Sequence, residues 1–432
     1  MKYQEAIDFL FPLRRFGMKP GLERVIRLLH AVGDPQKRLG KVVHIAGTNG
    51  KGTVACALAA IFSAAGYTTG LYTSPHLVSF TERIRVNGKM IPESQLAAYC
   101  KVLKDEIITE KATFFEATTA IAFMYFSDMQ VDVSVIETGM GGRLDATNVV
   151  DPDYVIIPNI GKDHTGWLGE TVEEIAAEKA AIIKKGARAY TAVQEPAALK
   201  PILDRADAVG AEVTVLRDKA ELVVNSAVIG KLDFTLTTQG LRIRNLEAEV
   251  TGDFHASNLS LAVLAACNAG IEEGAIRQGL LSIKKSGYRA RLERLSRQPD
   301  LLLDVSHNPD GMEKSVEILH RFRGVYREVF VVLGLVRDKD AVEMVRCLKK
   351  LTNNVITVNL PSERGMSTAE LGDLCRNEGF RVTVVETARE ALDMVRGTAG
   401  KNDLILVTGS FYLAGEIVGL LNCYNSAKWR DC

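Results

Sequence analysis

Short runs rich in valine and isoleucine alternate with helical patterns along this chain, and the alternation occurs twice. In the first region, from about residue 41 to 193, it predicts a mostly parallel sheet with helices on its faces. The expected helices span residues 51–65 and 171–184. The expected strands are KVVHIAG, TTGLYTS, VDVSVIETG and YVIIPNIG.

Residues 212–250 show a different pattern, with shorter strands separated by turn residues: EVTVL, ELVVN, LDFTLTTQ and LRIRNLEAEV. This pattern predicts a small antiparallel annex on the first domain, followed by a helix over 257–269. After the charged segment 284–300 the alternation restarts with LLLDVSH, EVFVVLGL, NVITVNL, RVTVVE and DLILVTGS. We therefore expect a second α/β domain, and a cleft between the two domains that can hold ligands.

Charge and composition exclude several classes of function. Lys and Arg together number 53, as do Asp and Glu, so no net field draws the protein to nucleic acid or to an anionic membrane. No segment approaches the roughly 20 apolar residues of a membrane span. The seven cysteines form no C-x-x-C pair and read as reduced thiols. We expect a cytoplasmic protein.

A glycine-rich segment with a lysine follows the first strand and opens a helix, the context in which such a loop cradles phosphate. Backbone N–H groups and the helix N-terminus favour an anion, and Lys51 can reach the terminal phosphates. The alternative is a tight turn with a solvated lysine. The loop comprises Gly47, Thr48, Asn49, Gly50, Lys51, Gly52 and Thr53.

Gly52 occupies the position where a phosphate loop commonly carries the hydroxyl that binds magnesium. Either Thr53 or a hydroxyl from another loop must replace it, and Ser74 is the obvious choice because it closes the next expected strand. Glu137 and His164 follow two further strands, and parallel strands end at one edge of the sheet. Singly, each is ordinarily a solvated residue. Together they predict a magnesium site, in which the histidine is the less usual ligand.

Eight segments together resemble the bacterial folylpolyglutamate synthase family, relatives of the Mur ligases, from about residue 16 to 420. They are HIAGTNGKGT, YTSPHLVSFTERIRVNG, IETGMGGRLDATNV, KDHTGWLG, EKAAI, LDVSHNPDG, GLVRDKD and VTGSFYLAGEI. The resemblance implies an N-terminal P-loop domain (1–290), a linker (291–300) and a C-terminal Rossmann-like α/β domain (301–432). It also implies a monomer that uses ATP and magnesium to attach glutamate.

Within this family, the magnesium ligands map onto Ser74, Glu137 and His164. The resemblance further implies that Lys179 is carbamylated and touches a second magnesium ion. Without the resemblance, Lys179 reads as an exposed lysine on helix 171–184. Lys51, Lys179 and His307 are the expected catalytic residues.

The resemblance places further ATP contacts at Asn258, Arg291, Asp304 and His307. The family often has Pro-Gly-Arg where this chain has Arg289-Ala290-Arg291, so Arg289 could compete with Arg291 for the phosphate. Asp304 and His307 lie at the end of the first expected strand of the second domain, where a doubly wound sheet binds ligands.

Positions for the pterin end of a folate substrate fall on two segments and on Pro75, which begins a loop over 75–80 like the family's mobile substrate loop. Aromatic rings can stack on a flat heterocycle while a carboxylate accepts from its N–H groups. The alternative is that one or both phenylalanines are helix core residues. The segments are Thr113, Phe114, Phe115, Glu116 and Leu144, Asp145, Ala146.

These parts predict a ligase that adds L-glutamate to dihydropteroate, to the glutamate tail of reduced folates, or to both, through an acyl phosphate. One alternative is a Mur-type ligase with a UDP-linked substrate. The 46 residues before Gly47 are too few for the separate domain that binds UDP in those enzymes. The other alternative is a P-loop binding protein without ligase activity, which the second α/β domain disfavours.

Overall fold

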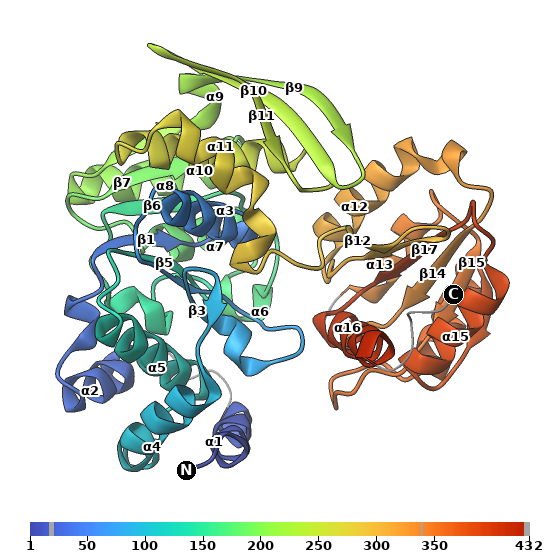
Figure 1. Cartoon of the computed structure of the whole chain (residues 1–432), viewed down its shortest axis with the longest axis horizontal. Coiled ribbons are helices and arrows are strands. Elements are labelled where there is room, and N and C mark those ends of the chain that lie inside the picture. Colours follow the sequence, from blue (N-terminus) through green and yellow to red (C-terminus); the bar gives the residue numbers. More distant parts are fainter. Residues whose placement is uncertain (17–20, 338–339, 427–432) are drawn as a thin grey trace.

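The computed structural model describes residues 1–16, 21–337 and 340–426. They form two α/β lobes with a three-stranded hairpin sheet above the space between them (Figure 1). The predicted α/β architecture is confirmed. Within the described residues, every helix is too short or too polar to cross a membrane.

An eight-stranded sheet forms the centre of the N-terminal lobe, in the order β4-β3-β2-β5-β1-β6-β7-β8. The strands β1, β2 and β5 to β8 are parallel, and the hairpin β3–β4 closes one edge. The strands are β1 (Lys41–Ile45), β2 (Thr69–Tyr72), β3 (Ile84–Val86), β4 (Lys89–Met90), β5 (Val133–Glu137), β6 (Tyr154–Ile157), β7 (Arg188–Thr191) and β8 (Glu212–Val215).

Alternate residues of β1 face two different cores. Val43 and Ile45 pack with α3 (Lys51–Ala64), α10 (His255–Asn268) and α11 (Glu273–Leu281). Val42 packs on the opposite side, in the cluster of α1 (Tyr3–Leu10), α2 (Glu23–Ala31), α4 (Glu93–Thr109) and α5 (Phe114–Asp128). A third cluster is formed by α7 (Val172–Ala180) and α8 (Pro196–Val209). Helix α3, which follows the phosphate loop, is thus fixed from several sides.

The sequence predicts four strands in the antiparallel annex, whereas the structure has three. The first predicted segment forms β8, which pairs in parallel with β7 in the main sheet, because α8 provides the crossover that parallel strands require. The antiparallel sheet contains β9 (Ala220–Val228), β10 (Lys231–Thr238) and β11 (Leu241–Ala248). Two-residue turns ending at Gly230 and Gly240, both at positive φ, connect these strands.

The predicted helix 171–184 ends earlier, at Ala180. In a continuing helix the carbonyl of Glu178 would accept from the N–H of Ile182. Instead Arg143 N–H donates to it at 2.9 Å, and the chain turns so that Ile182 and Ile183 are buried. Lys179 therefore lies in the last turn of α7.

The C-terminal lobe contains a six-stranded sheet in the order β12-β13-β17-β14-β15-β16. Five strands are parallel, as predicted: β13 (Asp300–Leu303), β14 (Val329–Leu333), β15 (Asn354–Thr357), β16 (Arg381–Val384) and β17 (Leu404–Thr408). The sixth, β12 (Glu293–Ser296), lies within the segment expected to be a linker and pairs antiparallel with β13. The linker segment thus contributes a strand to the C-terminal sheet.

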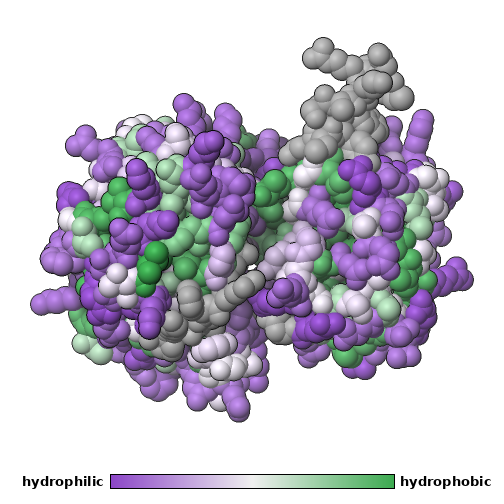
Figure 2. Space-filling view, turned by 90° about the horizontal axis from the view of Figure 1, so that it is seen from below, coloured by the Kyte–Doolittle hydropathy of each residue, from purple (hydrophilic) through white to green (hydrophobic). Residues whose placement is uncertain are grey.

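Helices cover both faces of this second sheet. The helices α12 (Pro309–Arg321), α13 (Ala341–Leu348) and α14 (Thr368–Asn377) share one core cluster. The helices α15 (Ala388–Thr398) and α16 (Phe411–Ser426) share the other. Viewed from below, the two lobes are divided by a narrow furrow (Figure 2).

Candidate active site

The glycine-rich loop connects β1 to α3 and is held from outside. Thr48 N–H donates to the carbonyl of Asn159 at 2.9 Å, and the Thr48 hydroxyl donates to the carbonyl of Gly161 at the same distance. Gly50 has a φ of 89°, a left-handed conformation that favours glycine. A Cβ at Gly50 would also lie 2.7 Å from Oδ1 of Asn258, so the Asn258 amide rests directly on the loop. The predicted strand–loop–helix context of the phosphate loop is present.

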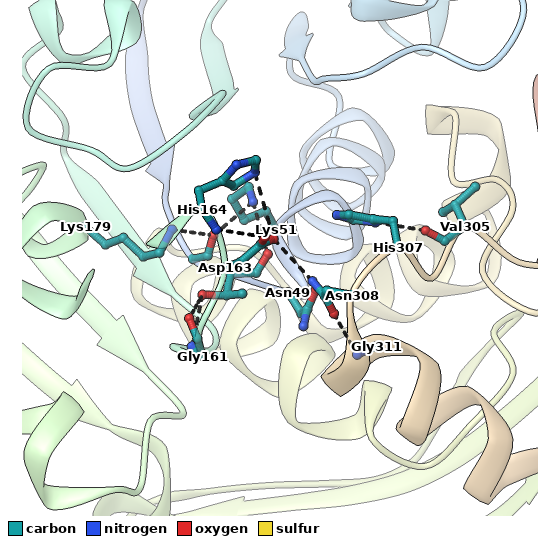
Figure 3. Close-up of polar contacts among 12 residues, drawn as sticks. Asn49, Lys51, Gly161, Asp163, His164, Lys179, Val305, His307, Asn308 and Gly311 are labelled. Carbon is teal, nitrogen blue, oxygen red and sulfur yellow. Dashed lines mark hydrogen bonds and ion pairs between the residues drawn. The ribbon is translucent and has the colours of Figure 1, made fainter. Parts of the chain in front are cut away.

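Two lysines share one carbonyl at the start of this loop. Lys51 Nζ donates to the Gly47 carbonyl at 2.9 Å and to that of Thr48 at 3.3 Å, while Lys179 Nζ donates to the Gly47 carbonyl at 3.1 Å (Figure 3). Lys179 is buried, contrary to the reading of an exposed helix lysine. Burial, followed by repulsion from Lys51, lowers the pKa of Lys179 to about 7. A large fraction of Lys179 is therefore a neutral amine near neutral pH.

Arg291 lies against the residue that departs from the usual loop pattern. A Cβ at Gly52 would lie less than 3.0 Å from a terminal nitrogen of the Arg291 guanidinium. A serine or threonine there would displace this arginine, which gives a physical reason for glycine. Arg289 is instead paired with Glu293, its Nε donating to the carboxylate at 2.6 Å. Of the two arginines that the sequence left open, Arg291 is the one at the loop.

Ser74 and Glu137 are neighbours at the ends of β2 and β5, where Ser74 N–H donates to Glu137 Oε2 at 3.4 Å. Glu137 is buried, and burial raises the pKa of its carboxyl against the opposing effects of Lys51 and Arg291. Two buried hydroxyls, that of Thr53 in the phosphate loop and that of Thr138 next to Glu137 in sequence, have no hydrogen-bond partner within the described residues. A carboxylate with hydroxyl oxygens is the donor set that magnesium prefers.

His164 follows β6 in a left-handed conformation, with a φ of 53°. Its N–H donates to Asp163 Oδ1 at 2.9 Å, and its imidazole Nε2 lies 3.9 Å from Asp163 Oδ2. In Figure 3, His164, Asp163 and Lys51 lie together beside the phosphate loop. Among the residues that the structure describes, no three His, Cys, Asp or Glu side chains form a ready metal cluster. A metal here would need hydroxyl, backbone or phosphate ligands as well, which is consistent with Ser74 and Thr53.

The C-terminal lobe reaches the phosphate loop through the start of α12. Asn49 Nδ2 donates to Asp310 Oδ2 at 2.6 Å, and Asn308 Nδ2 lies 3.3 Å from both Asn49 Oδ1 and Asp163 Oδ2. Asn308 also caps α12 by accepting from Gly311 N–H at 2.8 Å (Figure 3). We did not single out Asn308, Asp310 or Asp163 from the sequence, although all three lie in segments that carry the family resemblance.

The two C-terminal residues expected to contact ATP differ in their surroundings. Asp304 is buried and accepts from the N–H groups of Leu292 (3.2 Å) and Ser306 (3.1 Å) and from the hydroxyl of Ser315 (3.1 Å). It therefore fixes the strand end. Nδ1 of His307 lies 2.9 Å from the Val305 carbonyl, and its ring packs on Phe411. These contacts orient the His307 imidazole.

The residues expected at the pterin are divided between an aromatic cluster and local helix caps. Phe114 stacks on Phe11, with ring centroids 5.8 Å apart, and lies edge-on to Phe80, with Arg83 over its face at 5.3 Å. Phe115 packs on Gly139, where an added Cβ would lie 2.6 Å from its ring. Both phenylalanines thus also have packing roles. Sequence reasoning missed Arg83, a buried cation within the TERIR segment.

Both carboxylates expected to bind the pterin already have partners in the protein. Glu116 accepts from Thr113 N–H at 2.7 Å in a capping box and pairs with Arg24 at 3.0 Å. Asp145 is buried, accepts from Met140 N–H (2.9 Å) and the Thr147 hydroxyl (2.5 Å), and has its pKa raised by burial. The other members of these segments range from Ala146, which is buried, to Leu144, which is 47% exposed; Pro75 is exposed.

The sequence matches two family descriptions. Residues 45–266 match the Mur ligase middle domain, and residues 290–411 match the Mur ligase glutamate ligase domain. The dihydrofolate synthase/folylpolyglutamate synthase of Bacillus subtilis (strain 168) is 33% identical over 428 residues, covering 96% of this chain and 98% of that protein. The chain belongs to the dihydrofolate synthase/folylpolyglutamate synthase family. It is therefore a ligase that forms carbon–nitrogen bonds.

Solved structures agree with this membership. The Escherichia coli FolC in complex with DHPP and ADP has a TM-score of 0.86 and 30% identity, covering 98% of this chain and 99% of that one. The bifunctional folylpolyglutamate synthase/dihydrofolate synthase of Yersinia pestis, complexed with AMPPNP and a Mn ion, has a TM-score of 0.86, 29% identity and 98% coverage of both chains. Both share the two-lobed fold of this family member.

Proposed function

We propose that this enzyme uses ATP to add L-glutamate to dihydropteroate, to the glutamate tail of reduced folates, or to both. The observation that carries the proposal is the convergence at one loop of Lys51 and Arg291, with Asp310 of the second lobe bonded to Asn49 of the same loop. An anionic, phosphate-bearing substrate fits this arrangement, because both cations and the helix N-terminus favour negative charge. Relatives solved with ADP or AMPPNP support the choice of nucleotide.

The reaction needs an activated acyl group because a free carboxylate does not form an amide readily in water. The pteroate or folate carboxylate oxygen bonds to the γ-phosphorus of ATP, and ADP leaves, which gives an acyl phosphate. The glutamate amine then bonds to the acyl carbon, and phosphate leaves with the C–O bond electrons while the nitrogen loses a proton. Lys51, Arg291 and the loop N–H groups stabilise the transferring phosphoryl group and hold it in position.

The donor set at the loop fits magnesium. We assign Ser74, Glu137 and His164 to one ion, with the Thr53 hydroxyl as a further oxygen ligand, and carbamylated Lys179 to a second. When bound, magnesium neutralises phosphate charge that the chain's own cations do not. The Mn ion in the Yersinia pestis structure supports a divalent ion in this family.

Carbamylation of Lys179 is supported by its surroundings. Only a neutral amine adds carbon dioxide, and the pKa of Lys179 is lowered to about 7. A plain ammonium about 4 Å from a cation would be repelled by roughly 4 kcal/mol per unit charge at an effective dielectric of 20. A carbamate would replace that repulsion with an anionic ligand.

The pterin end of the substrate is assigned to the region of Pro75, Phe114 and Phe115, flanked by Leu144 and Ala146. Glu116 and Asp145 act here mainly through the backbone that they hold, since their carboxylates already accept from Thr113, Met140 and Thr147. We assign the remaining ATP contacts to Asn258, Asp304 and His307. We also propose that the chain divides into a P-loop domain (1–290), a linker (291–300) and a C-terminal domain (301–432). The protein would act as a monomer in the cytoplasm.

An assay of ADP release tests the function directly. ATP and magnesium are supplied with either dihydropteroate or tetrahydrofolate, with and without L-glutamate. We expect ADP release that depends on both glutamate and one or both pterins, with an amide product of matching mass. Release that proceeds equally without glutamate would favour a P-loop protein without ligase activity. Release only with a UDP-linked substrate would favour the other Mur-type ligases.

A further inference from the structure

The loop over 75–80 is held in one shape by a single carboxylate. Glu82 accepts hydrogen bonds from three successive backbone N–H groups, those of Leu77 (3.0 Å), Val78 (2.9 Å) and Ser79 (2.8 Å). Three such bonds to one charged group define the path of the chain, because charge-assisted bonds are stronger than neutral ones. The loop therefore behaves as a preformed unit.

The two sides of this loop face different parts of the molecule. On one side the His76 ring lies 6.2 Å from Phe11 and 6.0 Å from Phe80, and Arg83 Nε donates to His76 Nδ1 at 2.8 Å. This is the aromatic cluster that contains Phe114. On the other side Leu77 packs against the core cluster of the C-terminal lobe that includes α16. Figure 1 shows this light-blue loop reaching from the N-terminal lobe towards α16.

Gly415 allows this contact. A Cβ at Gly415 would lie less than 3.0 Å from the backbone carbonyl oxygen of Leu77 and 3.0 Å from its carbonyl carbon. Both atoms are backbone, so the loop would have to move to accommodate any side chain. Gly419, one turn later in the same helix, would place a Cβ in open space. Close approach, and not helix composition, thus distinguishes Gly415.

We propose that Gly415 and Leu77 form a docking contact through which the C-terminal lobe positions the 75–80 loop and the pterin end of the substrate. Gly415 and Leu77 are positioning residues for the proposed function, on which this inference rests. The loop joins Ser74, next to Glu137, to Phe80 of the aromatic cluster. A displacement at Gly415 is therefore transmitted to the pterin region.

The test compares Gly415→Ala with Gly419→Ala. Both substitutions favour the helix by up to about 1 kcal/mol, so neither should lower stability through helix propensity. For Gly415→Ala we expect KM for the pterin substrate to rise tenfold or more, with KM for ATP within twofold of wild type. Gly419→Ala should leave both constants unchanged. Equal pterin KM values in Gly415→Ala and wild type would overturn the proposal.

A second readout needs no substrate and separates this inference from the proposed function. Limited thermolysin digestion, with cleavage sites mapped by mass spectrometry, should cut within 75–80 at least fivefold faster in Gly415→Ala than in Gly419→Ala.

Leu77→Ala tests the same contact from the other side, because it removes the apolar side chain without a clash. It should raise KM for the pterin substrate as Gly415→Ala does, and it keeps the test open if Gly415→Ala fails to fold. In the double variant, which carries Gly415→Ala and Leu77→Ala together, KM for the pterin substrate should rise no more than in the more affected single variant. Additive effects, or unchanged cleavage, would contradict docking. Absent turnover in wild type would count against the proposed function alone.

Discussion

At the scale of single residues, the phosphate loop brings two lysines to the Gly47 carbonyl. Lys51 begins α3 and is half-buried, whereas Lys179 is buried, and the charge of Lys51 adds to the burial that lowers the pKa of Lys179. The motif in the sequence predicts Lys51, because glycines and lysine stand at fixed spacing after a strand. It cannot predict the burial of Lys179, which depends on where α7 ends.

Lys179→Ala should reduce turnover at least a hundredfold and recover part of it with added acetate, which can occupy the space and ligand position of a carbamate. Lys179→Arg should not be rescued, because its positive charge remains.

Because the pKa of Lys179 is about 7, the neutral amine becomes scarce as pH falls below 7. Wild type depleted of carbon dioxide should therefore regain activity more slowly at pH 6 than at pH 8 when both samples receive the same concentration of dissolved carbon dioxide. An unmodified lysine mass in active, metal-loaded enzyme would refute this prediction.

Glu116, Arg289 and Arg291 show which residue roles a sequence pattern can predict and which it cannot. Thr113 and Glu116 stand three residues apart before an apolar run, which is a capping-box signal readable from sequence. That signal predicts the capping role that Glu116 has in the structure, beside the substrate contact that the family resemblance implies. By contrast, Arg289 and Arg291 cannot be distinguished by sequence, because their partners Glu293 and Gly52 are set by the fold.

At the scale of elements, strand and helix alternation predicts both sheets but not their edges. The sequence places the β8 segment in the antiparallel annex, because a short strand has no pattern that tells which sheet it will join, and it predicts no strand at β12. Helix α3 illustrates the opposite case. It is apolar on all sides, and the structure buries it between β1, α10 and α11. Close packing of α11 on α3 fixes the helix that opens at the phosphate loop.

Gly279→Ala and Gly274→Ala, both in α11, test this packing. A Cβ at Gly279 would lie less than 3.0 Å from the backbone of Ile61 in α3, whereas one at Gly274 would meet nothing within 4 Å. We expect Gly279→Ala to lower the free energy of unfolding by about 1–3 kcal/mol, as overpacking does. Gly274→Ala should raise it by up to about 1 kcal/mol. Urea denaturation measures both, and equal values for the two variants would contradict the close approach of α11 to α3.

At the scale of the whole molecule, a few contacts join the two lobes. Asp253 pairs with Arg321, Phe254 packs on the C-terminal core, Leu77 meets α16, and Asn49 bonds to Asp310. The last of these starts at the phosphate loop itself. Binding at the loop and the orientation of the C-terminal lobe are therefore linked through Asn49.

Asp310→Ala should weaken this link without unfolding either lobe. Asp310 is at the surface in the first turn of α12, also pairing with Lys314, so its loss should change the free energy of unfolding by less than about 1 kcal/mol. KM for ATP should nevertheless rise about threefold to tenfold, because the loop loses its 2.6 Å bond to the second lobe. Asp373→Ala is the matched control, since Asp373 pairs with Arg376 within α14. Small-angle scattering should show a larger radius of gyration for Asp310→Ala than for Asp373→Ala when a non-hydrolysable ATP analogue is bound. If the two variants agree in both KM and radius, the Asn49–Asp310 bond does not link nucleotide binding to lobe orientation.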